Sequence, residues 1–115
     1  MKIWPFIAAL CMAYTLIATP AHAENWVMAV DDGAYWIEVD IDSIAARQDG
    51  LVAARTRGGD QAEKLFDCKA RISYTTRLEV MGGIDYPNWR QHGDAIVPGS
   101  IGEKAMEFIC ARARR

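Results

Sequence analysis

The chain has 115 residues, of which 51% are hydrophobic, and it carries a formal net charge of −2 at pH 7. A slightly acidic chain lacks the basic surface on which nucleic-acid binding depends, so we expect no nucleic-acid partner. No repeat or long linker divides the sequence after residue 23, which predicts a single domain over residues 24–115.

The first 23 residues have the pattern of a secretory signal peptide. Lys2 supplies a short cationic start, residues 3–18 are almost wholly apolar, and the segment ends in Ala-His-Ala. This pattern predicts cleavage between Ala23 and Glu24, and therefore a periplasmic or secreted protein.

Two other interpretations of this segment fit less well. A membrane-spanning anchor needs about 20 apolar residues, whereas this apolar run is shorter and is followed by Pro20. Lipidation at Cys11 would require a small residue before the cysteine, and Leu10 stands there. We therefore expect no stable membrane anchor in the exported protein.

Cleavage would remove Cys11 and leave Cys68 and Cys110, which predict a disulfide in an oxidising compartment. The bond would close a loop of about 43 residues and stabilise a small domain by roughly 4 kcal/mol in the chain-entropy model. Two cysteines with one distant histidine match no zinc-site spacing, and no Cys-x-x-Cys redox motif is present. A structural disulfide is the favoured interpretation.

The first half of the domain predicts antiparallel strands. Apolar and polar residues alternate on both sides of Asp31-Asp32-Gly33, which is typical of a β-hairpin. The expected elements are, in order, strands at 26–30 and 35–39, a single helical turn at 42–46, a tight turn at 49–50, a strand at 51–57 and a loop at 58–61.

Residues 65–81 carry the strongest periodic signal of the chain. Even positions are mostly apolar and odd positions mostly charged. Successive strand side chains point to opposite faces, so Cys68 is expected on the buried face. Because strands usually end by about ten residues, this length predicts a long bent strand, or two strands that meet at a bulge near Ser73.

The last residues predict a helix. Ser100 and Glu103 have the spacing of a capping box, and apolar residues then recur at helical spacing, with Cys110 beside that stripe. The sequence thus predicts an α+β fold, a curved antiparallel β-sheet of about five to six strands with the helix packed on its apolar face. The bond between Cys68 and Cys110 would tie the helix there.

Five short patterns occur in a defined order along the domain. They are Trp26 at the start of the first strand, Tyr35 to Ser43-Ile44, residues 65–68 followed by Lys69 and Arg71, residues 96–100, and Phe108-Ile109-Cys110. In this order they resemble the surface-adhesin E-like family of small exported bacterial proteins. The resemblance implies a curved antiparallel sheet with a disulfide-tied C-terminal helix on its concave side. The naming member is a lipid-anchored adhesin for host matrix proteins, whereas this chain lacks a lipobox; fold transfers more safely than function.

An enzymatic function would depend on His92, the single histidine of the mature chain. A hydrolase needs a nucleophile and an orienting carboxylate beside such a base, and no motif such as Gly-x-Ser-x-Gly is present. His92 and Asp94 could supply two metal ligands, fewer than a site requires. We therefore expect no catalytic activity, no metal and no cofactor.

Residues 82–93 form the longest stretch without a clear strand or helix pattern. They include Tyr86, Trp89, Arg90 and His92, residue types that are enriched at binding hot spots. These four residues are the candidate partner-binding site. The alternative for Trp89 is that it packs against the edge of the sheet.

Basic residues could also give the outer sheet face a cationic character. They are Arg55, Arg57, Lys69, Arg71 and Arg77. Because Asp67 and Glu79 are interspersed among them, an ordinary solvated surface is the favoured interpretation.

The function that the sequence favours is an exported, non-catalytic binding module of the bacterial envelope, adhesin-like in the sense of the resemblance. Its partner would be a protein or another envelope component. A small periplasmic enzyme that uses His92 as acid or base is the first alternative. A structural protein that forms a homodimer through an open sheet edge is the second.

Overall fold

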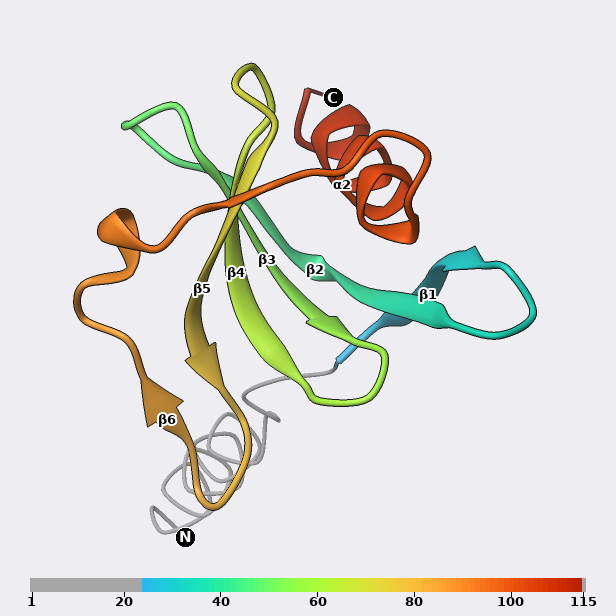
Figure 1. Ribbon diagram of the computed structural model, residues 1–115, viewed down its shortest axis with the longest axis horizontal. Coiled ribbons are helices and arrows are strands. Elements are labelled where there is room, and N and C mark those ends of the chain that lie inside the picture. Colours follow the sequence, from blue (N-terminus) through green and yellow to red (C-terminus); the bar gives the residue numbers. More distant parts are fainter. Residues whose placement is uncertain (1–23, 115) are drawn as a thin grey trace, which may run out of the picture.

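The computed structural model of the protein describes residues 24–114. The predicted signal peptide at residues 1–23, with Ala23 at the expected cleavage site, lies outside the described residues. The described chain forms an antiparallel sheet and a C-terminal helix (Figure 1). Its elements are β1 (Trp26–Asp31), β2 (Trp36–Ala46), β3 (Val52–Arg57), β4 (Ala62–Asp67), β5 (Ile72–Leu78), β6 (Ile84–Asp85), the 3-10 turn η1 (Trp89–Gln91), β7 (Asp94–Ala95) and α2 (Ile101–Ala113).

The predicted hairpin is confirmed in β1 and β2. Within its turn the Asp31 carboxylate accepts a hydrogen bond from the N–H of Gly33 (2.9 Å), and the Asp32 carboxylate accepts one from the N–H of Tyr35 (2.7 Å). Gly33 has a φ of 92°, a left-handed conformation that glycine adopts without steric cost. The two aspartates and the glycine therefore stabilise the turn that the sequence predicts.

The helical turn expected at residues 42–46 is wrong, because these residues continue β2. Pairing between β2 and β3 shifts register between Asp40 and Ala45. At this irregularity the Ser43 hydroxyl donates to the carbonyl of Asp40 (2.6 Å) and accepts from the N–H of Arg55 (2.8 Å). A serine that satisfies backbone groups in this way keeps the chain extended across the irregular stretch.

The alternating stretch 65–81 forms a hairpin and not the expected long or bulged strand. β4 ends at Asp67, and a tight turn leads into β5. The Asp67 carboxylate accepts hydrogen bonds from the N–H groups of Lys69 (3.1 Å) and Ala70 (2.9 Å), and Arg71 closes the turn with a φ of 59°. Local hydrogen bonding by the aspartate thus stabilises a turn inside an unbroken alternating pattern.

The hairpin changes which residues share a face of the sheet. Phe66 pairs with Ser73, and Leu65 pairs with Tyr74. Directly opposed residues point to the same side, and Phe66 belongs to the core cluster beneath the helix. Tyr74 therefore points away from the helix. The single apolar face expected for residues 65–81 is wrong, because the apolar even positions change sides between β4 and β5.

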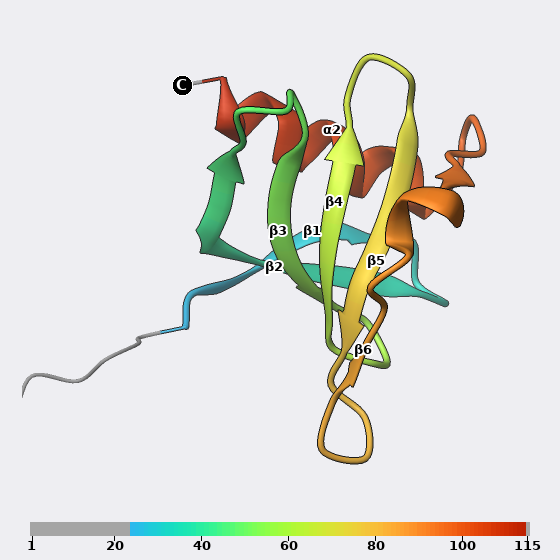
Figure 2. The same cartoon turned by 90° about the vertical axis from the view of Figure 1, so that its left-hand side faces the viewer.

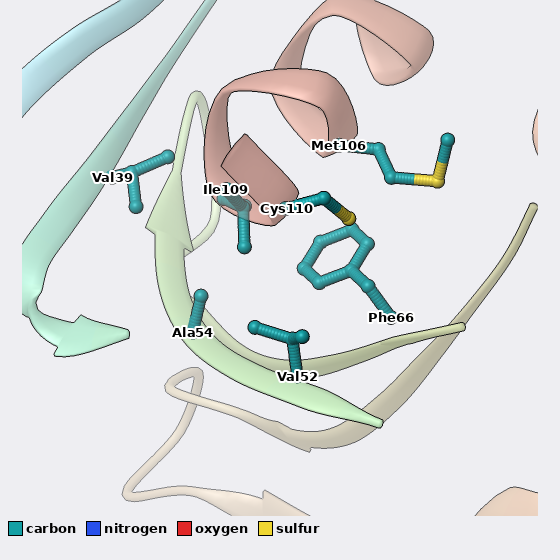
Figure 3. Packing of buried hydrophobic residues seen from close by; sticks show 7 residues of the cluster. All are labelled: Val39, Val52, Ala54, Phe66, Met106, Ile109 and Cys110. Carbon is teal, nitrogen blue, oxygen red and sulfur yellow. The ribbon is translucent and has the colours of Figure 1, made fainter. Parts of the chain in front are cut away.

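The helix α2 packs on the inner side of the curved sheet, against β1, β2 and β3 (Figures 1 and 2). Side chains from the helix and from β2, β3 and β4 meet in a buried apolar cluster (Figure 3). Its buried members are Val39, Val52, Ala54, Phe66, Met106, Ile109 and Cys110. The predicted α+β fold is confirmed.

The predicted disulfide between Cys68 and Cys110 is also confirmed, with Cα atoms 6.1 Å apart. Cys68 lies in the turn after β4, half-buried against the core cluster, and not on the strand face where it was expected. The bond therefore joins the β4–β5 turn to the last turns of the helix.

The start of α2 follows the capping-box pattern in part. The Ser100 hydroxyl accepts from the N–H of Glu103 (3.2 Å), as expected. The Glu103 carboxylate accepts from the N–H of Gly99 (3.1 Å), whereas the N–H of Ser100 donates to the carbonyl of Val97. Glu103 also forms an ion pair with Arg71 of the β4–β5 turn, so a polar link lies near the disulfide.

Candidate functional site

The edge of the sheet is interrupted along β5. The short strand β6 pairs with Arg77 and Leu78, and β7 pairs with Ile72 and Ser73. Between these two contacts the chain leaves the edge and forms η1, which lies on the opposite side of β5 from α2 (Figures 1 and 2). The middle of β5 is therefore left without a strand partner on this edge, and the η1 segment lies beside it.

Gly93 allows the chain to return closely to β5 after η1. A Cβ atom at this position would lie 2.7 Å from Ile72 Cγ2 and 2.7 Å from Tyr74 Cε1. Both contacts are closer than side chains tolerate, so the close packing of the loop on the outer face of β5 requires glycine here.

An apolar pocket opens where the edge is interrupted. Its volume is about 410 Å³, within the range of about 300–1,000 Å³ that is typical of small-molecule sites. The lining residues come from β5, from the end of β6 and from the η1 segment. They are Thr75, Leu78, Tyr86, Trp89 and His92. We call this the aromatic pocket.

Three of the four residues predicted to bind a partner thus line one cavity. Tyr86, Trp89 and His92 do so, and Arg90 does not. Tyr86 is 39% exposed and is placed by a hydrogen bond from its N–H to the carbonyl of Thr76 (2.9 Å). His92 is exposed, and its imidazole forms no hydrogen bond with another described residue. The pocket therefore offers two aromatic walls and one imidazole.

Trp89 is half-buried and serves both as packing and as a pocket wall. Its ring meets that of Tyr74 edge to face, with centroids 5.3 Å apart. The guanidinium groups of Arg90 and Arg47 lie 4.5 and 5.6 Å from the centroid of the Trp89 ring. Aromatic and cation–π contacts of this kind each contribute about 0.5–1 kcal/mol or more. They hold the ring in place before any ligand binds.

Arg90 positions the loop. Its guanidinium donates to the Asp49 carboxylate (3.1 Å), which also pairs with Arg47 (2.9 Å). The N–H of Leu51 is the main cause that lowers the pKa of Asp49, and the two arginines lower it further. The pair Arg90–Asp49 therefore joins η1 to the turn between β2 and β3.

The basic residues of the expected cationic surface are largely matched by carboxylates. Arg55 pairs with Glu24 (2.7 Å) and Asp40 (3.4 Å), and Arg57 pairs with Glu38 (3.1 Å). Further pairs join Arg71 to Glu103 and Arg77 to Glu79 and Asp85. The favoured interpretation of a balanced, solvated surface agrees with these contacts.

Three further large apolar side chains are exposed at the β1–β2 hairpin, far from the aromatic pocket along the strand order. They are Met28, Tyr35 and Trp36, which are 49%, 67% and 46% exposed. These three side chains line neither the aromatic pocket nor the cavities around Arg55 and around Asp49. These side chains are therefore an alternative candidate contact surface to the aromatic pocket.

Comparison of the chain with family models, with curated proteins and with solved structures finds no match in any of the three. The resemblance to the surface-adhesin E-like family therefore stays a prediction. Within residues 24–114, no helix is long and apolar enough to cross a membrane. The same residues contain no group of three or more His, Cys, Asp or Glu side chains arranged to hold a metal ion.

Several residues of the site were not identified from the sequence. Thr75 and Leu78 were interpreted as parts of one long bent strand or of two strands that meet at a bulge near Ser73. Tyr74 and Arg47 were not linked to Trp89. One signal was available in Tyr74. If β4 and β5 are recognised as a hairpin, the large ring of Tyr74 faces away from the helix, which indicates that another segment packs on it there. The contact with Arg47 joins residues far apart in the sequence, and no local pattern indicates it.

Proposed function

We propose that this protein is an exported, non-catalytic binding module of the bacterial envelope whose aromatic pocket receives an apolar group of its partner. The observation that carries the proposal is the convergence of Tyr86, Trp89 and His92 on one cavity of about 410 Å³. Aromatic residues held in a concave site are the usual energetic centres of recognition. The signal-peptide pattern supports an envelope or extracellular location.

The arrangement favours binding over acid–base chemistry. A catalytic histidine is oriented by a carboxylate or another hydrogen-bonding partner, and the imidazole of His92 has no such partner among the described residues. Trp89, in contrast, is already fixed by Tyr74 and two arginines. A wall fixed in advance lowers the entropy cost of binding.

The test is a titration with phenylnaphthylamine, a neutral apolar dye that fluoresces when it leaves water. We expect saturable binding to the mature protein, at least about tenfold weaker in Trp89→Ala and weaker in Tyr86→Ala, since hot-spot aromatic residues contribute at this level. Circular dichroism and urea unfolding would establish that the variants remain folded.

The matched control is Trp36→Ala, which removes the same side chain at the β1–β2 hairpin. We expect this variant to bind the dye as the wild type does. A dye affinity that survives Trp89→Ala and falls in Trp36→Ala would move the binding surface to the hairpin and contradict the proposal.

A further inference from the structure

Lys64 lies on β4 and lines a second cavity, of about 510 Å³, which shares Trp89 with the aromatic pocket. It pairs with Ala54 on one side and with Thr75 on the other, and opposed residues share a face of the sheet. Ala54 points toward the helix (Figure 3), so Lys64 and Thr75 lie on that face, whereas Trp89 packs on Tyr74, which points to the other face. The aromatic pocket is lined from both faces and therefore lies at the edge of the sheet. Because Thr75 lines the pocket, the Lys64 side chain starts one strand away from the pocket wall.

The ammonium group of Lys64 lacks a close counter-ion within residues 24–114. It is half-buried and forms no ion pair with a described carboxylate. Burial lowers the pKa of Lys64, and the charge of Asp94 acts in the opposite direction. Asp94 pairs with Ser73 on the same face of the sheet. Its negative charge therefore favours the protonated form of Lys64 without contacting the ammonium group.

This situation differs from that of four arginines on the sheet and its turns. Arg55, Arg57, Arg71 and Arg77 each contact at least one carboxylate. A partly buried charge is costly unless an opposite charge or several hydrogen bonds accompany it. Lys64 is therefore a cation for which the described residues supply no contacting anion, and it lies next to a cavity.

We infer that the ligand of the aromatic pocket is an amphiphilic anion, whose apolar body occupies the pocket and whose carboxylate or sulfonate group pairs with Lys64. The inference rests on the proposed function, because it names the chemical class of the pocket's ligand. The apolar body meets Leu78, Tyr86 and Trp89, and the anion meets the ammonium through charge-assisted hydrogen bonds, which are stronger than neutral ones.

The experiment compares two dyes of nearly the same shape. Anilinonaphthalene sulfonate carries one negative charge, and phenylnaphthylamine carries none. In Lys64→Met, which keeps the apolar stem and removes the charge, we expect the affinity for the sulfonate dye to fall about tenfold or more. The affinity for the neutral dye should change less than about twofold, because its contacts are apolar.

Lys69→Met is the matched control, since Lys69 is exposed in the β4–β5 turn. It should alter neither affinity, and Lys64→Arg should restore most of the binding of the sulfonate dye. An undiminished affinity of Lys64→Met for the sulfonate dye, with neutral-dye binding intact, overturns the inference and leaves the proposed function standing. Failure of the wild type to bind either dye removes the proposed function, and the inference with it.

A second measurement uses the wild-type protein and does not depend on whether Lys64→Met folds. Side-chain nitrogen NMR of labelled lysines should show a shift of the Lys64 ammonium resonance with the sulfonate dye and a much smaller one with the neutral dye. The Lys69 resonance should stay in place with both dyes. Equal responses of Lys64 to the two dyes would contradict the inference.

Discussion

The two sides of the sheet are held by different kinds of contact. On the inner side, α2 is fixed by a fully buried apolar cluster and a disulfide. On the outer side, η1 is fixed by the edge-to-face contact of Trp89 with Tyr74, by the cation–π contact of Arg47 with Trp89 and by the ion pair of Arg90 with Asp49. The comparison teaches that the core and the proposed binding segment are held by different contacts, so that one can be changed without changing the other.

Removal of the disulfide should produce the largest difference between its effect on stability and its effect on dye binding. In the double variant Cys68→Ala/Cys110→Ala, we expect the free energy of unfolding to fall by about 4 kcal/mol, because the unfolded chain regains the freedom of a long loop. Urea unfolding measures this loss. Dye affinity in the absence of urea should stay within about threefold of the wild type.

A double variant that remained as stable as the wild type would show that the helix is held by its apolar contacts alone. A double variant with a lower free energy of unfolding that also failed to bind the dye under native conditions would show that the core and the pocket form one cooperative unit.

The core itself should give the next largest effect. Ile109 on α2 is 0% exposed, so Ile109→Ala leaves a cavity and should lower the free energy of unfolding by about 2–5 kcal/mol. Val97→Ala provides the control, since Val97 is 65% exposed and should change stability by no more than about 0.5 kcal/mol. If dye affinity fell in parallel with stability in Ile109→Ala, the two sides would not be independent.

The smallest effect should come from the polar link beside the disulfide. The N–H of Gly99 is the main cause that lowers the pKa of Glu103, and Arg71 lowers it further. A lowered pKa means that the folded state binds this proton less readily than the unfolded chain. The stability that Glu103 contributes is therefore complete above about pH 5, and it is lost as the pH falls through about 4.3 toward the lower folded value.

We expect Glu103→Gln to reduce stability slightly at neutral pH and to flatten the loss of stability as the pH falls below about 5. Urea unfolding at a series of pH values measures both effects. Glu107→Gln is the control one turn later on the same helix, where the carboxylate is 60% exposed and 3.8 Å from Arg71. Identical pH profiles for the two variants would show that Glu103 has no special role.

The fold was largely predictable because its main signals are local or covalent. The hairpin at Asp31-Asp32-Gly33, the serine cap at Ser100 and the pairing of Cys68 with Cys110 each follow from residue types at a fixed spacing. The error over residues 65–81 has one cause. A turn stabilised by the Asp67 side chain leaves the alternating pattern intact, so periodicity alone does not reveal it.

The site was predictable only in part, for the same reason. Tyr86, Trp89 and His92 are unusual residues in a stretch without regular pattern, and composition alone drew attention to them. Their contacts with Thr75 and Leu78 depend on the pairing of β5 with β6. The sequence indicated no role for Lys64, which precedes the alternating stretch 65–81. Its role depends on which face of the sheet it occupies, and the hairpin determines that face.

The bond between Cys68 and Cys110 also makes a closed ring of the chain between them. All five residues that line the aromatic pocket lie inside this ring. A protease that cut the exposed segment around Asn88 would therefore leave the two pieces attached to each other until the disulfide was reduced. If the protein is exported, as proposed, such a ring means that a single cut by an extracellular protease in this segment does not release any part of the molecule.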